Sequence, residues 1–106
     1  MKIRTTTLAA GLVFVLGTAL SYAAPASENW ENLCTKCHGA DGKGLTKIGK
    51  KLSLKDYTDA KAQASFTDAE ALKVILEGKE KMKGYKDKIT EAEAKEQVKY
   101  IRAFKK

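Results

Sequence analysis

The chain has 106 residues, with 20 Lys and Arg against 13 Asp and Glu, two Cys and a single His. This length suits one small domain and excludes a two-domain enzyme. With 43% hydrophobic and 31% charged residues, the composition is that of a folded protein that is neither disordered nor rich in disulfides.

The N-terminal stretch has the pattern of an export signal. Lys2 and Arg4 precede an apolar run, 8–20, which closes on the small residues Ser21 and Ala23. The run has 13 residues, fewer than the roughly 20 that a membrane-spanning helix needs. We therefore expect export, to the periplasm or an equivalent compartment.

Cleavage after Ala23 fits this pattern best, with cuts after Ala24 or Ala26 and an uncleaved anchor as alternatives. We thus expect a signal peptide over 1–23 and a mature domain over 24–106. That domain keeps 18 basic and 13 acidic residues, a net charge of +5. A domain of this size commonly needs a covalent cross-link or a bound metal for stability.

The first expected element of the mature chain is a short helix. Ser27 is a candidate N-cap, and the helix would run through Trp30 and Leu33 into Cys34. The glycine-rich passage 39–44 would end it.

Two further helices are expected after a segment without clear periodicity. Residues 45–66 predict only a covering loop, with one helical turn near 58–64. The capping box at 67–70 opens a helix that stops at Gly78, and a second box at 90–93 opens the last helix. Three helices and no strand predict an all-α domain with a thin core.

Both cysteines lie in one group with the only histidine, Cys34-x-x-Cys37-His38. This pattern is the attachment motif of a covalently bound c-type haem. On a helix, Cys34 and Cys37 lie on neighbouring turns of one face, where each thiol can add to one vinyl group of the porphyrin. His38 would then supply the proximal iron ligand.

Two other sites could use the same residues. A thioredoxin-like Cys-x-x-Cys centre belongs beside a strand and a crossover helix, and the mature sequence has no alternating apolar run of useful length. A structural zinc site needs four ligands, whereas the chain has no further Cys or His. Both alternatives are weaker than haem attachment.

Met82 is the only methionine after the leader and lies in a strongly polar stretch, Lys79 to Tyr85. An isolated methionine ordinarily fills a gap in a core. Here the attachment motif upstream and the absence of a second His favour Met82 as the other axial ligand of iron. A gap is expected between Cys37, His38 and Met82, lined by apolar side chains that include Leu52 and Tyr85.

From Trp30 to Phe104 the sequence resembles the small class I c-type cytochromes of the exported, single-haem bacterial kind. The matching pieces are Trp30, the passage Cys34-x-x-Cys37-His38-Gly39-x-Asp41-Gly42-x-Gly44, Gly49, Leu52, Met82 with Tyr85, and Tyr100-Ile101-Arg102.

The resemblance implies the class I cytochrome c fold, with three to four short helices around one haem c attached through Cys34 and Cys37. It implies crossing first and last helices, axial ligands His38 and Met82, and a soluble single-electron carrier rather than an enzyme. With both axial positions filled, the iron has no open site for substrate. The alternative is a five-coordinate haem that binds small gases or acts on peroxide.

Three positions depart from the family pattern. Lys50 replaces a usual proline, and its carbonyl is the expected partner of the His38 ring N–H. Lys83 replaces a proline common after the ligand methionine, and Gln97 stands where an apolar residue is frequent. These changes bear on the rigidity of the methionine loop more than on the ligand itself.

The basic charge predicts the kind of partner. Lysines follow the haem motif and surround Met82, so they would steer the protein to acidic docking patches on a reductase or oxidase. Their alternative role is a solvated surface. No motif for nucleic acid accompanies them. We expect a monomer that meets membranes only through its partners.

Overall fold

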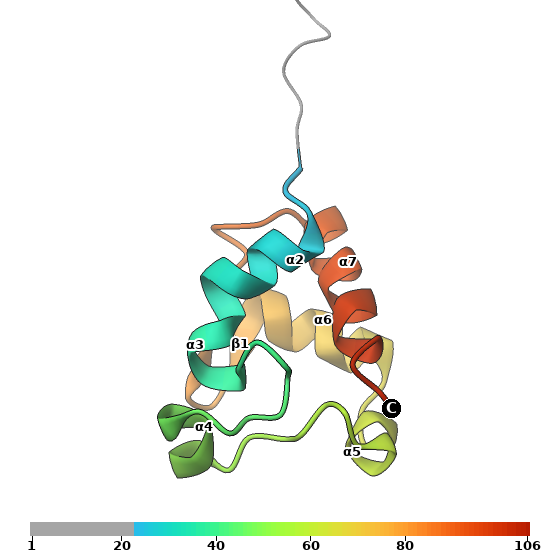
Figure 1. Cartoon of the computed structure of the whole chain (residues 1–106). Coiled ribbons are helices and arrows are strands. Elements are labelled where there is room, and N and C mark those ends of the chain that lie inside the picture. Colours follow the sequence, from blue (N-terminus) through green and yellow to red (C-terminus); the bar gives the residue numbers. More distant parts are fainter. Residues whose placement is uncertain (1–22) are drawn as a thin grey trace, which may run out of the picture.

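The computed structural model describes residues 23–106 (Figure 1). The predicted signal peptide, apart from Ala23, lies outside the described residues. The described helices are α2 (Ala26–Asn29), the π-helical turn η1 (Trp30–Cys34), α3 (Thr35–His38), α4 (Lys47–Leu52), α5 (Ala60–Ala64), α6 (Asp68–Glu77) and α7 (Glu91–Arg102). None of them is long and apolar enough to cross a membrane.

α2, η1 and α3 follow one another without a break and form the expected first helix. The predicted N-cap at Ser27 is wrong, because α2 begins at Ala26 and its N-cap is Pro25. The Pro25 carbonyl accepts the backbone N–H groups of Glu28 and Asn29, so Ser27 lies inside the first turn. The helix ends as expected at Gly39, whose φ of 84° is one that glycine adopts readily.

Both predicted capping boxes are present. Thr67 and Glu70 exchange side-chain and backbone hydrogen bonds at the start of α6, and Thr90 and Glu93 do the same for α7. Gly78 ends α6 with a φ of 86°, as predicted.

The segment 45–66 contains more structure than the covering loop that the sequence predicts. α4 begins after Thr46, whose hydroxyl accepts the Gly49 N–H, and α5 begins after Asp59, whose carboxylate accepts the Lys61 N–H. Only α5 falls in the turn expected near 58–64.

A short antiparallel hairpin joins β1 (Gly78–Lys79) to β2 (Met82–Lys83), which corrects the expectation of no strand. Gly78 pairs with Lys83 and Lys79 with Met82. The Tyr85 and Lys86 N–H groups then donate to carbonyls at the end of α6. Residues 23–106 are nevertheless mostly helical, which agrees with the expected class I cytochrome c fold.

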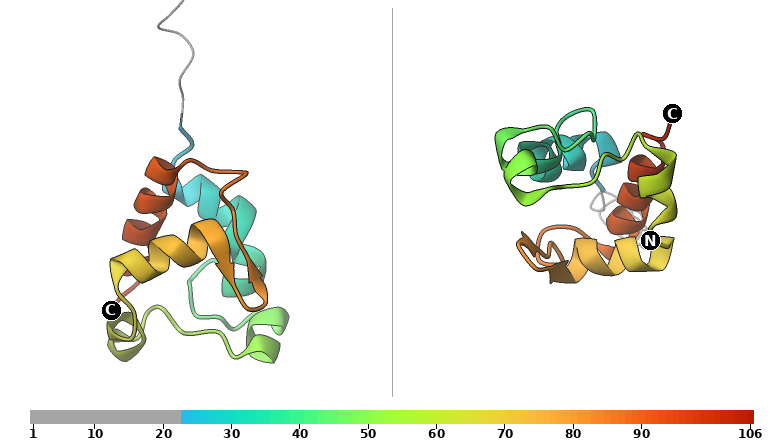
Figure 2. Two further views of the ribbon diagram at one scale, coloured as in Figure 1. Left: turned by 180° about the vertical axis from the view of Figure 1, so that it is seen from behind. Right: turned by 90° about the horizontal axis from the view of Figure 1, so that it is seen from below.

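The core lies where the first helix crosses α7. Trp30 is buried there, with ring centroids 5.7 Å from Tyr100 and 5.0 Å from Phe104. Ala94, Val98 and Ile101 supply the buried apolar face of α7. Figure 2 shows α6 and its hairpin on one side of the molecule and the first helix with α4 on the other.

Candidate functional site

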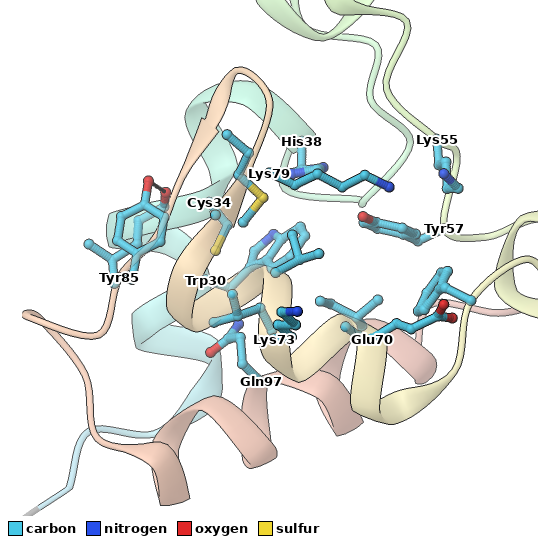
Figure 3. Close-up of a pocket in the computed structure, with 18 of the residues that line it drawn as sticks. Trp30, Cys34, His38, Lys55, Tyr57, Glu70, Lys73, Lys79, Tyr85 and Gln97 are labelled. Carbon is cyan, nitrogen blue, oxygen red and sulfur yellow. Dashed lines mark hydrogen bonds between the residues drawn. The ribbon is translucent and has the colours of Figure 1, made fainter.

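A cavity of about 520 Å³ lies between the first helix, α6, the hairpin and α7. Its volume is in the range of cofactor pockets. Figure 3 shows how the labelled side chains surround it. Apolar and aromatic side chains form much of the wall: Trp30, Leu33, Tyr57, Phe66, Ala71, Val74, Ile75, Tyr85, Ile89 and Ile101.

The structure brings Cys34, His38 and Met82 to this one cavity. Tyr85 also lines it, as predicted. Cys37 and Leu52 are half-buried and do not line it, so the expected lining is wrong at these two positions.

Leu52 is the last residue of α4, and Cys37 is in contact with the start of that helix. The Cys37 carbonyl accepts the Thr46 hydroxyl at 2.6 Å. A Cβ on Gly49 would lie only 2.7 Å from that carbonyl oxygen, so glycine is needed for the close approach. These contacts hold the end of the Cys-x-x-Cys-His segment against α4.

His38 lies in an aromatic environment. Its ring stacks on the ring of Tyr57, with 5.4 Å between the ring centroids, and its centroid lies 5.7 Å from that of Trp30. Burial lowers the pKa of His38 below its usual value, because the imidazolium loses solvation. A neutral imidazole is the form that binds a metal.

The ring nitrogen Nδ1 of His38 is buried and has no hydrogen-bond partner. The expected bond to the Lys50 carbonyl is therefore absent, which corrects that prediction. Because residue 50 lies inside α4, its carbonyl is directed along the helix and accepts the Ser53 N–H at 3.2 Å.

Cys34 is half-buried, and its thiol lies near Cys37. Burial, with a smaller contribution from Cys37, raises the pKa of its thiol to about 11. Reactive Cys-x-x-Cys centres depend on a lowered thiol pKa. The environment therefore does not support thiol–disulfide exchange.

Met82 is half-buried and reaches the cavity from β2. The hairpin fixes its position, although a lysine follows it where proline is common in the resembled family. The Tyr85 hydroxyl donates to the Leu33 carbonyl at 3.2 Å, which ties this segment to the first helix. The loop thus has backbone and side-chain supports on two sides.

Tyr57 and Gln97 line the cavity, although the sequence did not predict this position for either of them. Tyr57 lies in a segment without periodicity, so nothing in the sequence linked it to His38. Gln97 had a usable signal, because it falls at helical spacing from Ala94 and Ile101 on the buried face of α7.

The donor set fits a haem group. One imidazole, one thioether and one thiol line an otherwise largely apolar cavity, and they match the two axial ligands and one of the two attachment thiols of a c-type haem. The second thiol, Cys37, lies three residues after Cys34 in the same helical segment, outside the lining. The imidazole is that of His38, whose buried Nδ1 has no hydrogen-bond partner. In residues 23–106, no three His, Cys, Asp or Glu side chains gather as ligands of a separate metal ion.

Comparison with known proteins agrees with this chemistry. A family model described as "Cytochrome C oxidase, cbb3-type, subunit III" matches residues 22–101. No curated protein gives a significant match.

Two solved structures are similar over the whole of their own chains. The KustC0563 c-type cytochrome is 33% identical, covers 78% of this chain and 100% of its own, and has a TM-score of 0.72. A tyrosine-to-phenylalanine mutant of Kustc0563 is 32% identical, covers 77% and 100%, and has a TM-score of 0.69.

Proposed function

The chain belongs to the family of c-type cytochromes, which are haem-based electron carriers. We propose that it holds one haem c through Cys34 and Cys37, with His38 and Met82 as axial ligands. The observation that carries the proposal is the meeting of Cys34, His38 and Met82 at one cavity, although the hairpin and the first helix are distant in sequence.

Haem supplies an iron that accepts and releases one electron. The chain's residues have separate tasks in that chemistry. Cys34 and Cys37 would hold the group covalently, while the His38 imidazole and the Met82 thioether would bind its iron. The apolar walls formed by residues such as Ile75 and Ile101 exclude water.

The first test is covalent retention. The full-length chain is expressed in a cell that matures c-type cytochromes, and the purified protein is extracted with acid–acetone. We expect haem to remain with the polypeptide. Cys34→Ala and Cys37→Ala should each weaken attachment, whereas Lys36→Ala, between them, should retain haem. A colourless wild-type protein would contradict the proposal.

The second test separates the electron carrier from a five-coordinate haem. With Met82 bound to iron, the untreated ferrous protein should bind carbon monoxide slowly or not at all. Met82→Ala should bind it rapidly. Rapid binding by the wild type would favour gas binding or peroxide chemistry instead.

We also propose that the partners are redox proteins with acidic patches. Lys55, Lys73 and Lys79 are exposed and line the mouth of the cavity. Long-range attraction should make electron transfer to an acidic partner fall as salt rises. Lys55→Glu and Lys79→Glu should reduce that dependence, whereas Lys61→Glu on α5 should change it less. Equal effects of all three would contradict this docking surface.

Export to the periplasm remains part of the proposal. Its support is the pattern of residues 1–23 together with the usual location of this family. Mass spectrometry of the mature protein from a periplasmic fraction tests both the location and cleavage after Ala23. A cytoplasmic, uncleaved chain would contradict it.

A further inference from the structure

Two buried glutamines differ sharply in their surroundings. Gln63 is 5% exposed, and its amide donates to the Tyr57 and Ile101 carbonyls and accepts from Arg102. Gln97 is 1% exposed, yet neither its amide nitrogen nor its amide oxygen has a partner. Only Gln97 is part of the cavity wall described above.

An unpartnered amide in this position is costly. Burying such a group without hydrogen bonds disfavours folding by roughly tenfold or more. The neighbouring positions on this face of α7 are Ala94, Val98 and Ile101, all buried and apolar. An apolar side chain at position 97 would therefore pack there without the free-energy cost of burying an unpaired amide.

Figure 3 shows Gln97 projecting from α7 toward Trp30 at the floor of the cavity. Because the Gln97 side chain is almost fully buried and its amide has no hydrogen-bond partner, its dipole is poorly screened by water. Amide oxygen and nitrogen are similar in size, and no hydrogen bond fixes which of them faces the cavity. The amide can thus turn over without needing extra space.

We propose that Gln97 lowers the reduction potential of the haem by presenting this reorientable dipole to it. This inference rests on the proposed function as a haem-based electron carrier. When ferric haem takes one electron and becomes ferrous, its net charge falls by one and no atom is transferred. An amide free to take either orientation would turn its oxygen toward the positive iron–porphyrin core of the ferric state, and it would gain less from the uncharged core of the ferrous state. Gln97 therefore favours the oxidised form.

The test uses the haem-loaded full chain and replaces each glutamine with methionine, which is close to it in length and volume. Spectroelectrochemical titration measures the potential, and thermal unfolding measures stability. Gln97→Met should shift the ferric–ferrous equilibrium threefold to tenfold toward ferrous, an increase of about 28 to 59 mV. Its melting temperature should rise. Gln97→Leu, a second apolar replacement, should shift both in the same direction.

Gln63→Met is the matched control. It removes a buried amide that is fully hydrogen-bonded and lies outside the cavity wall, so the melting temperature should fall while the potential stays unchanged. A merely structural role for Gln97 would alter stability and not the potential.

An unchanged or lower potential in Gln97→Met and Gln97→Leu would overturn the inference, as would an equal shift in Gln63→Met. Failure of both Gln97 variants to fold would also contradict it, because the amide would then be needed for packing. Loss of haem from the wild type would instead contradict the proposed function.

Discussion

The Trp30 side chain contacts both the turn at Gly39 and the C-terminal segment. Its indole N–H donates to the Gly39 carbonyl at 3.0 Å in a buried hydrogen bond. Its ring packs on Tyr100 and Phe104 of the C-terminal segment. Trp30 thus fixes both the turn after His38 and the helix crossing.

Replacing Trp30 with Phe should lower the free energy of unfolding by about 1–3 kcal/mol, because the buried indole hydrogen bond is lost and the Gly39 carbonyl keeps only the Gly42 N–H, at 3.2 Å. Denaturant unfolding measures the change. Leu45→Ala is the control, since Leu45 is 61% exposed and its loss should alter stability by no more than about 0.5 kcal/mol. Equal stabilities for Trp30→Phe and the wild type would show that this bond is unimportant.

The chemistry of the site was predictable because few residues can supply it. One His, one Met and two Cys remain after the leader, and their spacing indicated haem attachment. The stacking of Tyr57 on His38 and the missing Lys50 bond could not be predicted, because both depend on how α4 and the following loop pack.

At the scale of elements, α6 and α7 were predictable from local signals. Their capping boxes and apolar faces lie within a few consecutive residues. α4 was missed because a six-residue helix is marginal by itself and is supported here by Thr46 and the Cys37 carbonyl. The hairpin was missed because its turn is Glu80-Lys81, without the Asn-Gly or Asp-Gly pair that usually marks such turns.

The capping box of α7 predicts a pH dependence of stability. The Thr90 N–H donates to the Glu93 carboxylate at 2.8 Å. The Ala24 nitrogen, which becomes the terminal amine if the chain is cleaved after Ala23, donates to it at 3.0 Å. These bonds lower the pKa of Glu93 in the folded state. The stabilisation is therefore present above the unfolded pKa, about 4.3, and is lost as pH falls through the lower folded value.

Glu93→Gln should melt at a lower temperature than the wild type at about pH 7, and the difference should shrink at about pH 3, where the carboxyl is protonated. Thermal unfolding at both pH values measures this. Glu31→Gln, which changes an exposed carboxyl of the first helix, is the control for net charge. A difference between Glu93→Gln and wild type that grows on acidification would contradict the assignment.

At the scale of the whole molecule, Arg102 joins the last helix to the segment that covers the cavity. Its guanidinium donates to the Gln63 and Phe66 carbonyls and to the Asp68 carboxylate. It also lies 4.3 Å from the centre of the Phe66 ring. Through Gln63, this network reaches the Tyr57 carbonyl.

Arg102→Lys should lower the free energy of unfolding by about 1–3 kcal/mol, because a single ammonium cannot serve these separated carbonyls. Lys99→Ala removes an exposed pair with Glu96 and should cost at most about 0.5 kcal/mol. Denaturant titration compares the two. Similar losses in both variants would indicate that Arg102 does not hold the covering segment.

We propose that His38 and Met82, from distant parts of the chain, bind one iron. The weak long-wavelength sulfur-to-iron absorption band of the ferric protein reports this ligation. The band should be present in the wild type and in Lys81→Ala, a neighbour in the same hairpin, and absent in Met82→Ala. A haem-loaded wild type without the band, or a Met82→Ala variant that retains it, would contradict the account.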